Sequence, residues 1–229
     1  HRGAHRAGGD GAGGVTSLRG ASNPHPRRVR VPRAARVLYG ETMIRRLVAR
    51  VFWRCSRWTL STSPAPDGAC VLVGAPHTSN WDFILMLAIA WRLDIHVHWM
   101  GKDSLFRGWM RPLMLALGGI PVDRDNPGGL IDDVLGRIRT DDHFALVITP
   151  DGTRSGHSRW KSGFYRIARE ADLPVILGYV DRTTMTTGLG PTLRLTGDVA
   201  ADMDRIRDFY SDKAGFTPAH RVEPRLREE

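Results

Sequence analysis

The sequence predicts an α/β fold with a mainly parallel central sheet flanked by helices, preceded by an N-terminal amphipathic helix. Three observations lead to this class. Beyond Pro66, short apolar runs that suit buried strands alternate with longer stretches of helical period. Strands separated by helices imply right-handed crossovers, which place the strands parallel in one sheet. Finally, an apolar stripe with basic flanks at 39–58 predicts the helix in front of the sheet.

The predicted elements follow one another in a regular order. The first strand is expected at 70–75, where every residue from Cys70 to Ala75 is apolar or glycine. Further strands are predicted at 95–100, 119–123, 144–149, 174–180 and 192–196. Helices are predicted at 81–92, 105–117, 128–139, 161–171 and 202–214. In such a sheet, ligands collect outside the carboxyl ends of the strands.

The helix expected at 39–58 has an amphipathic pattern. Ile44, Leu47 and Val51 recur at helical spacing, while most of the arginines lie elsewhere around the helix. An ordinary surface helix packed on the core is the alternative. The chain is thus expected to comprise a disordered basic segment at 1–36, a membrane-associating helix at 37–62, a folded domain at 63–216 and a charged tail at 217–229.

The positive charge is concentrated at the N-terminus. The chain carries +9, of which residues 1–36 hold +7 and residues 37–58 hold +4, so the remainder is slightly acidic. A nucleic-acid-binding domain is expected to carry its basic groups on the fold, whereas a basic N-terminal segment suits anionic lipid headgroups. An arginine-rich genome is the alternative, because only three of the 33 basic residues are lysines. We expect an anionic membrane surface as a partner and no nucleic acid.

Membrane spanning and secretion are not indicated by the sequence. No run of 18 apolar residues occurs, and the N-terminal segment has no apolar stretch of the signal-peptide type. Cys55 and Cys70 are the two cysteines and show no spaced pattern, which favours a reducing compartment. We therefore expect a peripheral or monotopic protein at the cytoplasmic face of the cell membrane.

A histidine and an aspartate lie just after the first predicted strand. In the run from Ala75 to Phe83, His77 precedes Asp82 with four residues between them. Imidazole has an unperturbed pKa of about 6.5 and accepts a hydroxyl proton near neutral pH, and a carboxylate on its other nitrogen fixes the tautomer. The pair predicts transfer of a group to an alcohol, although this spacing alone is a weak signal.

Three later segments strengthen this interpretation. They are Gly118 to Arg124 (GGIPVDR), Thr149 to Ser155 (TPDGTRS) and Leu173 to Leu177 (LPVIL). With the His77 segment they follow the order of the four sequence blocks of the glycerolipid acyltransferases, and the chain resembles the 1-acylglycerol-3-phosphate acyltransferase family. The resemblance implies transfer of a fatty acyl group from acyl-CoA or acyl carrier protein to the hydroxyl of a lysophospholipid such as 1-acylglycerol-3-phosphate, in phospholipid biosynthesis. It implies an acyltransferase domain at 63–216 and no metal or other cofactor.

The resemblance also assigns roles to individual residues. His77 would be the base and Asp82 would stabilise its imidazolium, while Arg124 and Arg154 would bind the acceptor phosphate, with added charge from Lys102. Guanidinium suits phosphate because its planar fork binds two oxygens. The segment Asp151, Gly152 and Thr153 would complete the substrate site, and backbone amides near Gly152 would be the oxyanion donors. The family usually has glutamate where this chain has Asp151, whose carboxylate lies one methylene closer to the backbone, so we expect an acceptor site of different shape.

Two other functions remain open on the sequence. The acceptor could be a glycolipid or an aminolipid, as Asp151 suggests, or the chain could be a basic membrane- or nucleic-acid-binding protein without catalysis. A metal site is disfavoured. His96 and His98 share a face of a predicted strand, but no companion ligand stands at a suitable spacing.

Overall fold

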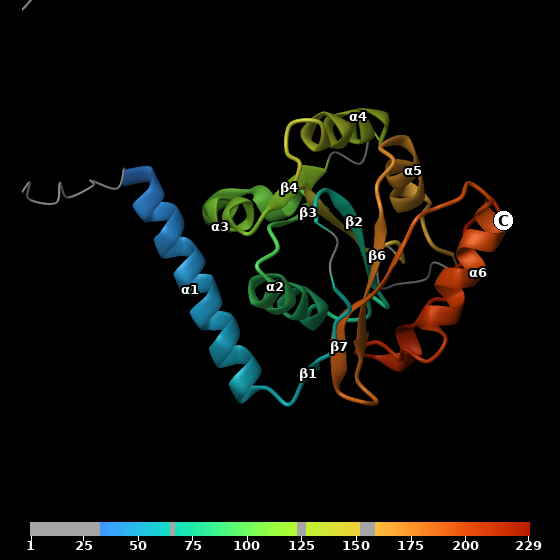
Figure 1. Ribbon diagram of the computed structural model, residues 1–229, viewed down its shortest axis with the longest axis horizontal. Coiled ribbons are helices and arrows are strands. Elements are labelled where there is room, and N and C mark those ends of the chain that lie inside the picture. The colour runs from blue at the N-terminus through green and yellow to red at the C-terminus, as the bar shows by residue number, and fades with distance from the viewer. Residues whose placement is uncertain (1–32, 65–66, 123–126, 152–158) are drawn as a thin grey trace, which may run out of the picture.

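The computed structural model describes residues 33–64, 67–122, 127–151 and 159–229, with the backbone alone for 33–41 and 127–130. Seven strands form one sheet in the order β1-β7-β6-β2-β5-β3-β4, with helices on both faces (Figure 1). The strands are β1 (Thr59–Leu60), β2 (Cys70–Ala75), β3 (Val97–Lys102), β4 (Gly119–Val122), β5 (Ala145–Ile148), β6 (Val175–Asp181) and β7 (Thr186–Leu193). The helices are α1 (Arg33–Cys55), α2 (Trp81–Leu93), α3 (Arg111–Ala116), α4 (Pro127–Ile138), α5 (Gly163–Glu170) and α6 (Val199–Tyr210).

The sheet is mainly parallel, which confirms the predicted fold class. Every neighbouring pair runs parallel except β6 and β7, which form an antiparallel hairpin. The central strand β2 pairs with β5 on one side and with β6 on the other. Since Val73 is in register with Ile148, the carboxyl ends of β2 and β5 meet at the same edge of the sheet. This edge carries the candidate site.

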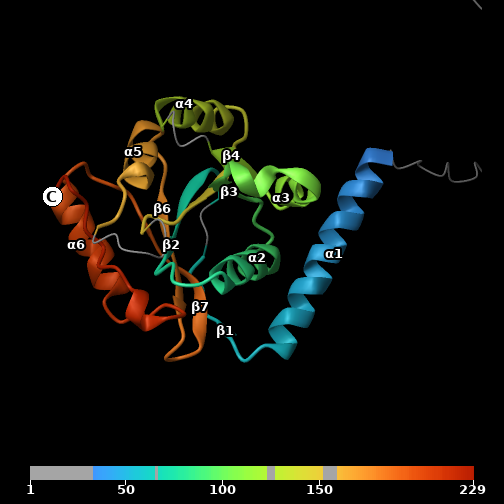
Figure 2. The same ribbon diagram turned by 180° about the vertical axis from the view of Figure 1, so that it is seen from behind.

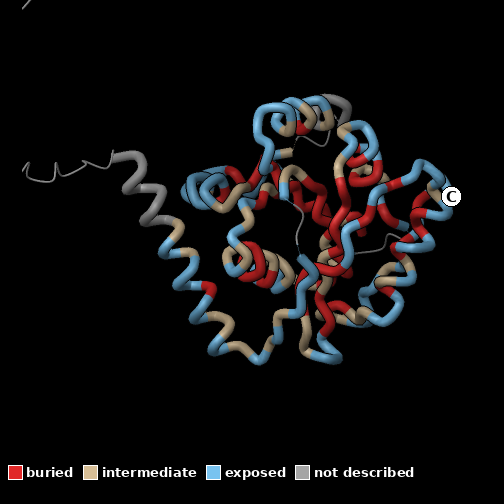
Figure 3. Tube along the Cα trace, in the orientation of Figure 1, coloured by how far each residue is buried: buried red, intermediate tan, exposed pale blue. Residues whose placement is uncertain are grey.

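The two faces of the sheet bury different helices. Along β2 the side chains alternate, so that Val71 and Val73 pack with residues of α4, α5 and α6, while Leu72 packs with residues of α2 and α3. Figure 2 shows α4, α5 and α6 grouped apart from α2 and α3. Most of the buried residues lie on the strands and on the inward sides of these helices (Figure 3). Side chains from both faces thus fix the positions of the strand ends.

Four predicted boundaries are wrong. The helix expected at 105–117 begins only at Arg111, after two short 3-10 turns, because Gly108 has a φ of +63°. The strand expected at 95–100 begins at Val97, because Asp94 ends α2 in the left-handed conformation. The strand expected at 192–196 is instead the longer β7, which turns back on β6. The last helix begins at Val199 rather than 202, where the Asp198 side chain accepts a hydrogen bond from Ala201 N.

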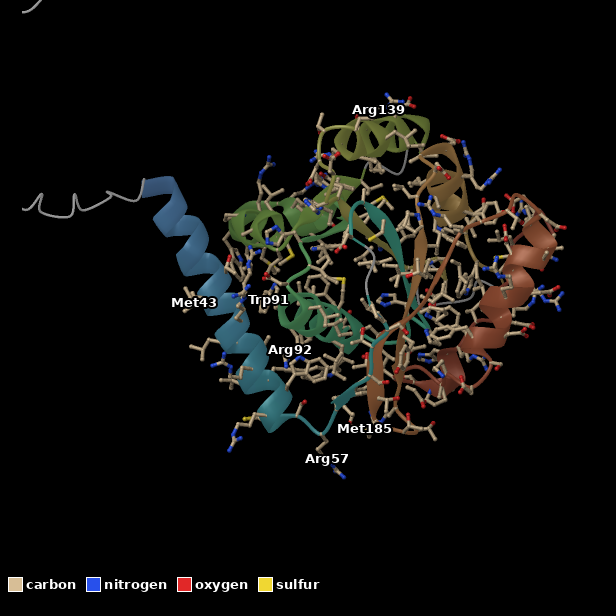
Figure 4. All side chains as sticks on the ribbon, in the orientation of Figure 1. Met43, Arg57, Trp91, Arg92, Arg139 and Met185 are labelled. Atoms are coloured by element: carbon tan, nitrogen blue, oxygen red, sulfur yellow. The ribbon has the colours of Figure 1, made fainter. Side chains whose placement is uncertain are left out.

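The first helix, α1, lies beside α2 at the edge of the molecule (Figure 1). It contacts the domain through Ala49, which is buried, through Trp53 Nε1, which donates to Ala88 O, and through an Arg46–Asp94 ion pair of 2.7 Å. The larger side chains of its apolar stripe remain 47–66% exposed, and Figure 4 shows Met43 on the side away from the sheet. In the described ranges no helix has the length and hydropathy needed to cross a membrane.

Candidate active site

His77 and Asp82 meet in the loop that joins β2 to α2. His77 Nδ1 lies 3.3 Å from Asp82 Oδ2, and their side chains are 21% and 9% exposed. The same Asp82 oxygen accepts hydrogen bonds from the backbone amides of Thr78 at 2.8 Å and Ser79 at 2.7 Å. One carboxylate therefore closes the loop on itself and fixes the imidazole. This is the geometry that an oriented general base requires.

A serine side chain, and not the residue at the N-cap position, binds the backbone at the helix start beside this loop. Ser79 Oγ accepts from Trp81 N at 3.2 Å, whereas Asn80, at the N-cap position, makes no side-chain cap hydrogen bond. Asp82 lies in the first turn of α2, where the partial positive charge of the helix end favours a carboxylate. The local sequence thus determines both the turn and the orientation of the Asp82 carboxylate toward it.

Asp151 supports the same loop from the neighbouring strand. It follows β5, is 5% exposed, and its Oδ2 accepts from the backbone amide of His77 at 2.6 Å. Its Oδ1 is buried without a hydrogen-bond partner in the described part of the chain. Burial raises the pKa of the Asp151 carboxyl to about 6, although the amide hydrogen bond from His77 acts in the opposite direction. Asp151 thus has one partner inside the protein, and its predicted contact with substrate stays a prediction.

The C-terminal segment forms a third support that sequence reasoning missed. Thr217 N donates to Thr78 Oγ1 at 2.9 Å, and Thr78 is only 3% exposed. Phe216 stacks between two tryptophans, Trp58 at 5.9 Å and Trp81 at 6.5 Å between ring centroids. Residues more than 130 positions downstream in the chain therefore hold the loop that carries His77.

Replacing Thr78 with valine tests this support. Valine keeps the volume but removes the acceptor, leaving the Thr217 amide without its partner, which costs about 1–3 kcal/mol. We expect a lower free energy of unfolding and a several-fold lower kcat with little change in KM, measured by urea denaturation and steady-state kinetics. Thr78→Ser is the control, since it keeps the hydroxyl. Equal behaviour of the two variants would contradict the role of this contact.

A cavity of about 1680 Å³, which we call the His77 cavity, adjoins His77. Its walls include His77 and Asp82 at the strand ends. Apolar side chains line the part between α2 and the sheet, among them Leu72, Phe83, Met86, Ile89, Trp99 and Val147. A space this large and apolar can hold a long hydrocarbon chain.

The structure locates some of the other residues predicted for the site. Lys102 ends β3, is exposed and lines the His77 cavity. Arg124, Gly152, Thr153 and Arg154 lie outside the described residues, so their predicted contacts with substrate stay predictions.

The structure also shows the burial and contacts of several aromatic residues and of His98. Trp99, Phe106, Phe164 and Tyr165 are buried in the core, and Trp99 also lines the His77 cavity, whereas Trp109 is 82% exposed. His98 stacks on Phe144 with ring centroids 4.3 Å apart. Among the described side chains, no three histidine, cysteine or acidic residues lie close enough together to hold a metal ion.

The chain is similar to known proteins in both sequence and fold. The family described as Acyltransferase matches residues 58–177. A 1-acyl-sn-glycerol-3-phosphate acyltransferase of Limnanthes alba is 36% identical over 80 residues, which are 33% of this chain and 28% of that protein. The crystal structure of the 1-acyl-sn-glycerophosphate (LPA) acyltransferase PlsC from Thermotoga maritima superposes with a TM-score of 0.52 at 11% identity, covering 80% of this chain and 81% of that chain. The structural match is one of fold.

Proposed function

Because this chain belongs to the acyltransferase family, we propose that it transfers a fatty acyl group from a thioester donor, acyl-CoA or acyl carrier protein, to a lysophospholipid hydroxyl in phospholipid biosynthesis. The observation that carries the proposal is the His77–Asp82 pair, 3.3 Å apart, at a large apolar cavity. The favoured acceptor is 1-acylglycerol-3-phosphate, by analogy with the relatives of that activity.

The proposed chemistry uses one base and forms no acyl-enzyme. Since His77 Nδ1 faces Asp82, Nε2 is the nitrogen left to accept the proton of the acceptor hydroxyl. The oxygen then attacks the thioester carbonyl, and the tetrahedral intermediate collapses to the ester and a thiolate. The thiolate takes the proton back from the imidazolium, which Asp82 has stabilised in the meantime. The base is thereby restored for the next cycle.

The side chains that line the His77 cavity suggest where the acyl chain and the acceptor phosphate would bind. The acyl chain would occupy the apolar space between α2 and the sheet. The acceptor phosphate would be met by Lys102 and by Arg124 and Arg154, whose guanidinium groups suit a phosphate.

The direct test is a transfer assay on the purified full chain. Labelled acyl-CoA and acyl carrier protein are offered with a panel containing lysophosphatidate, other lysophospholipids, a glycolipid and an aminolipid. We expect ester formation that is highest with lysophosphatidate. Highest activity with a glycolipid or aminolipid would favour the other acceptor class, and no transfer from either donor would contradict the proposed function.

We further propose that the protein works at the cytoplasmic face of the cell membrane, docked through α1. The exposed stripe on this helix includes Ile44 (63%), Leu47 (57%) and Val51 (53%). Arg50 and Arg54 lie on the same helix and suit anionic headgroups. An interfacial helix with its apolar face in the lipid would bring the His77 cavity close to substrates that reside in the membrane.

Replacing Ile44, Leu47 and Val51 together with serine tests the docking helix. These side chains are exposed, so the fold should persist, while affinity for anionic vesicles should fall at least tenfold because each buried methylene contributes about 0.8 kcal/mol. Vesicle sedimentation at low and high salt measures this. Arg50→Gln/Arg54→Gln serves for comparison and should weaken binding mainly at low salt. Unchanged sedimentation of the serine variant would place the docking surface elsewhere.

A further inference from the structure

The His77 cavity has a basic side that the catalytic pair does not explain. Besides His77, four charged residues of the described chain line the cavity: Asp82, Lys102, Lys161 and Arg166. Asp82 is committed to the loop of the base. The remaining three are cations, so the cavity presents a net positive field to whatever enters it.

Lys161 is held at the strand ends by its backbone. Its amide donates to Pro150 O at 2.8 Å, one residue before the Asp151 that binds the base loop. The preceding Trp160 is 4% exposed, packs in the core, and donates its amide to Arg225 O. Hydrogen bonds from the two consecutive amides of Trp160 and Lys161 therefore anchor the backbone of this segment. Its position relative to the His77 loop is determined by the sheet.

Arg166 lies one turn into α5, where Arg166 N donates to Ser162 O at 3.0 Å. Its neighbours Phe164, Tyr165 and Ile167 are buried, whereas Arg166 is exposed and lines the cavity. Its ion pair with Glu170 is 3.7 Å long and both side chains are solvent-exposed. Such a pair is weak, so the guanidinium can bind an incoming anion at low cost.

Lysine is rare in this chain, and its distribution is informative. Thirty of the 33 basic residues are arginine, and two of the three lysines, Lys102 and Lys161, line the His77 cavity. The third, Lys213, pairs with Asp212. Within the described part of the chain neither cavity lysine makes an ion pair. A lysine that is held by its backbone at a cavity and forms no ion pair with a described carboxylate suits a phosphate, for which ammonium acts as a point charge.

We propose that Lys161 and Arg166 form a phosphate-binding subsite of the His77 cavity. This subsite binds a phosphate group of a substrate while the reacting atom of that substrate lies beside His77. This inference rests on the proposed function. It adds a cationic site at the start of α5 to the residues that the sequence motifs indicate. The ligand chemistry is a phosphate ester, which both candidate substrates carry: coenzyme A in the donor, and the headgroup of the acceptor.

The test compares substrates with and without phosphate. Lys161→Met and Arg166→Gln are assayed with acyl-CoA against the matching acyl-pantetheine, and with lysophosphatidate against monoacylglycerol. We expect kcat/KM to fall at least tenfold with the phosphate-bearing member of one pair and by less than threefold with its phosphate-free partner. The pair that shows the difference identifies whether the subsite serves the donor or the acceptor.

Arg139→Gln is the matched control, because Arg139 points away from the molecule at the end of α4 (Figure 4) and does not line the cavity. It should behave as wild type with all four substrates. Equal losses with the charged and uncharged members of both pairs, or no loss in Lys161→Met and Arg166→Gln, would overturn the proposal.

Binding is measured as well, so that the outcome does not depend on turnover. Calorimetry with coenzyme A and with glycerol 3-phosphate should show at least tenfold weaker binding of one of them to the Lys161→Met/Arg166→Gln double variant than to wild type. Wild type that binds but transfers nothing would contradict the proposed function alone. Wild type that binds neither probe, or a double variant that binds both as tightly as wild type, would overturn the subsite.

Discussion

Replacing His77 with alanine is expected to reduce acyl transfer by about 10²- to 10⁴-fold, the contribution typical of a positioned general base. The side chain makes its close contact with Asp82 and lies in a loop rather than in the core, so the fold should be retained. The measurement is thiol release from acyl-CoA in the presence of acceptor, with circular dichroism on the same samples. His96→Ala is the control, since His96 is exposed and does not line the His77 cavity.

Asp82→Asn separates the two tasks of the carboxylate. Asparagine retains an oxygen for the amides of Thr78 and Ser79 but loses the charge that stabilises the imidazolium. We expect a large fall in kcat with a nearly unchanged acceptor KM. Normal turnover in either the His77→Ala or the Asp82→Asn variant would exclude the proposed mechanism.

The second large effect concerns the pH dependence of stability through Asp151. Burial raises the pKa of its carboxyl to about 6 in the folded protein, above the value of about 3.9 expected in the unfolded chain. Between these two values the folded state binds more protons than the unfolded state. The free energy of unfolding therefore falls as the pH rises from about 4 to about 6, by roughly 2 to 3 kcal/mol at 1.36 kcal/mol for each pKa unit.

The Asp151→Asn variant should not show this fall in the free energy of unfolding with rising pH. Asparagine can still accept the hydrogen bond from the His77 amide, but it cannot ionise. Relative to wild type, the variant should thus gain roughly 2 to 3 kcal/mol in the free energy of unfolding between pH 4 and pH 7. Urea denaturation at half-unit pH steps measures the difference. Asp142→Asn is the control, because Asp142 is exposed. Parallel pH profiles of stability for Asp151→Asn and wild type would refute a raised pKa of the buried Asp151 carboxyl.

The parts of the fold that could be predicted have a periodic or local signal. The run from Cys70 to Ala75 is apolar on both faces because helices cover both sides of the sheet, and the prediction matched β2. The His77–Asp82 pair was also accessible, because only four residues separate its members and a helix begins between them. Short-range geometry of this kind leaves few alternatives for the chain.

Strand β7 could not be predicted because its pattern is set by close packing and not by alternation. It contains Gly188 and Gly190, which interrupt any apolar run. A Cβ at Gly188 would lie 1.9 Å from Ser61 O, and one at Gly190 would lie 2.2 Å from the Phe209 ring. These glycines are required by neighbours that are distant in sequence, so the strand carries no local signal.

By itself the sequence determined the α/β class, the order of most strands and helices, and the pairing of His77 with Asp82, because each of these depends on residues within a few positions of one another. Only the tertiary structure decided which distant groups hold the base loop: Asp151 lies 74 residues from His77, and Thr217 lies 139 residues from Thr78. Parallel pairing of β2 with β5 brings the first contact together. The turn after α6 brings Thr217 to Thr78. Neither contact can be predicted from the periodicity of the sequence.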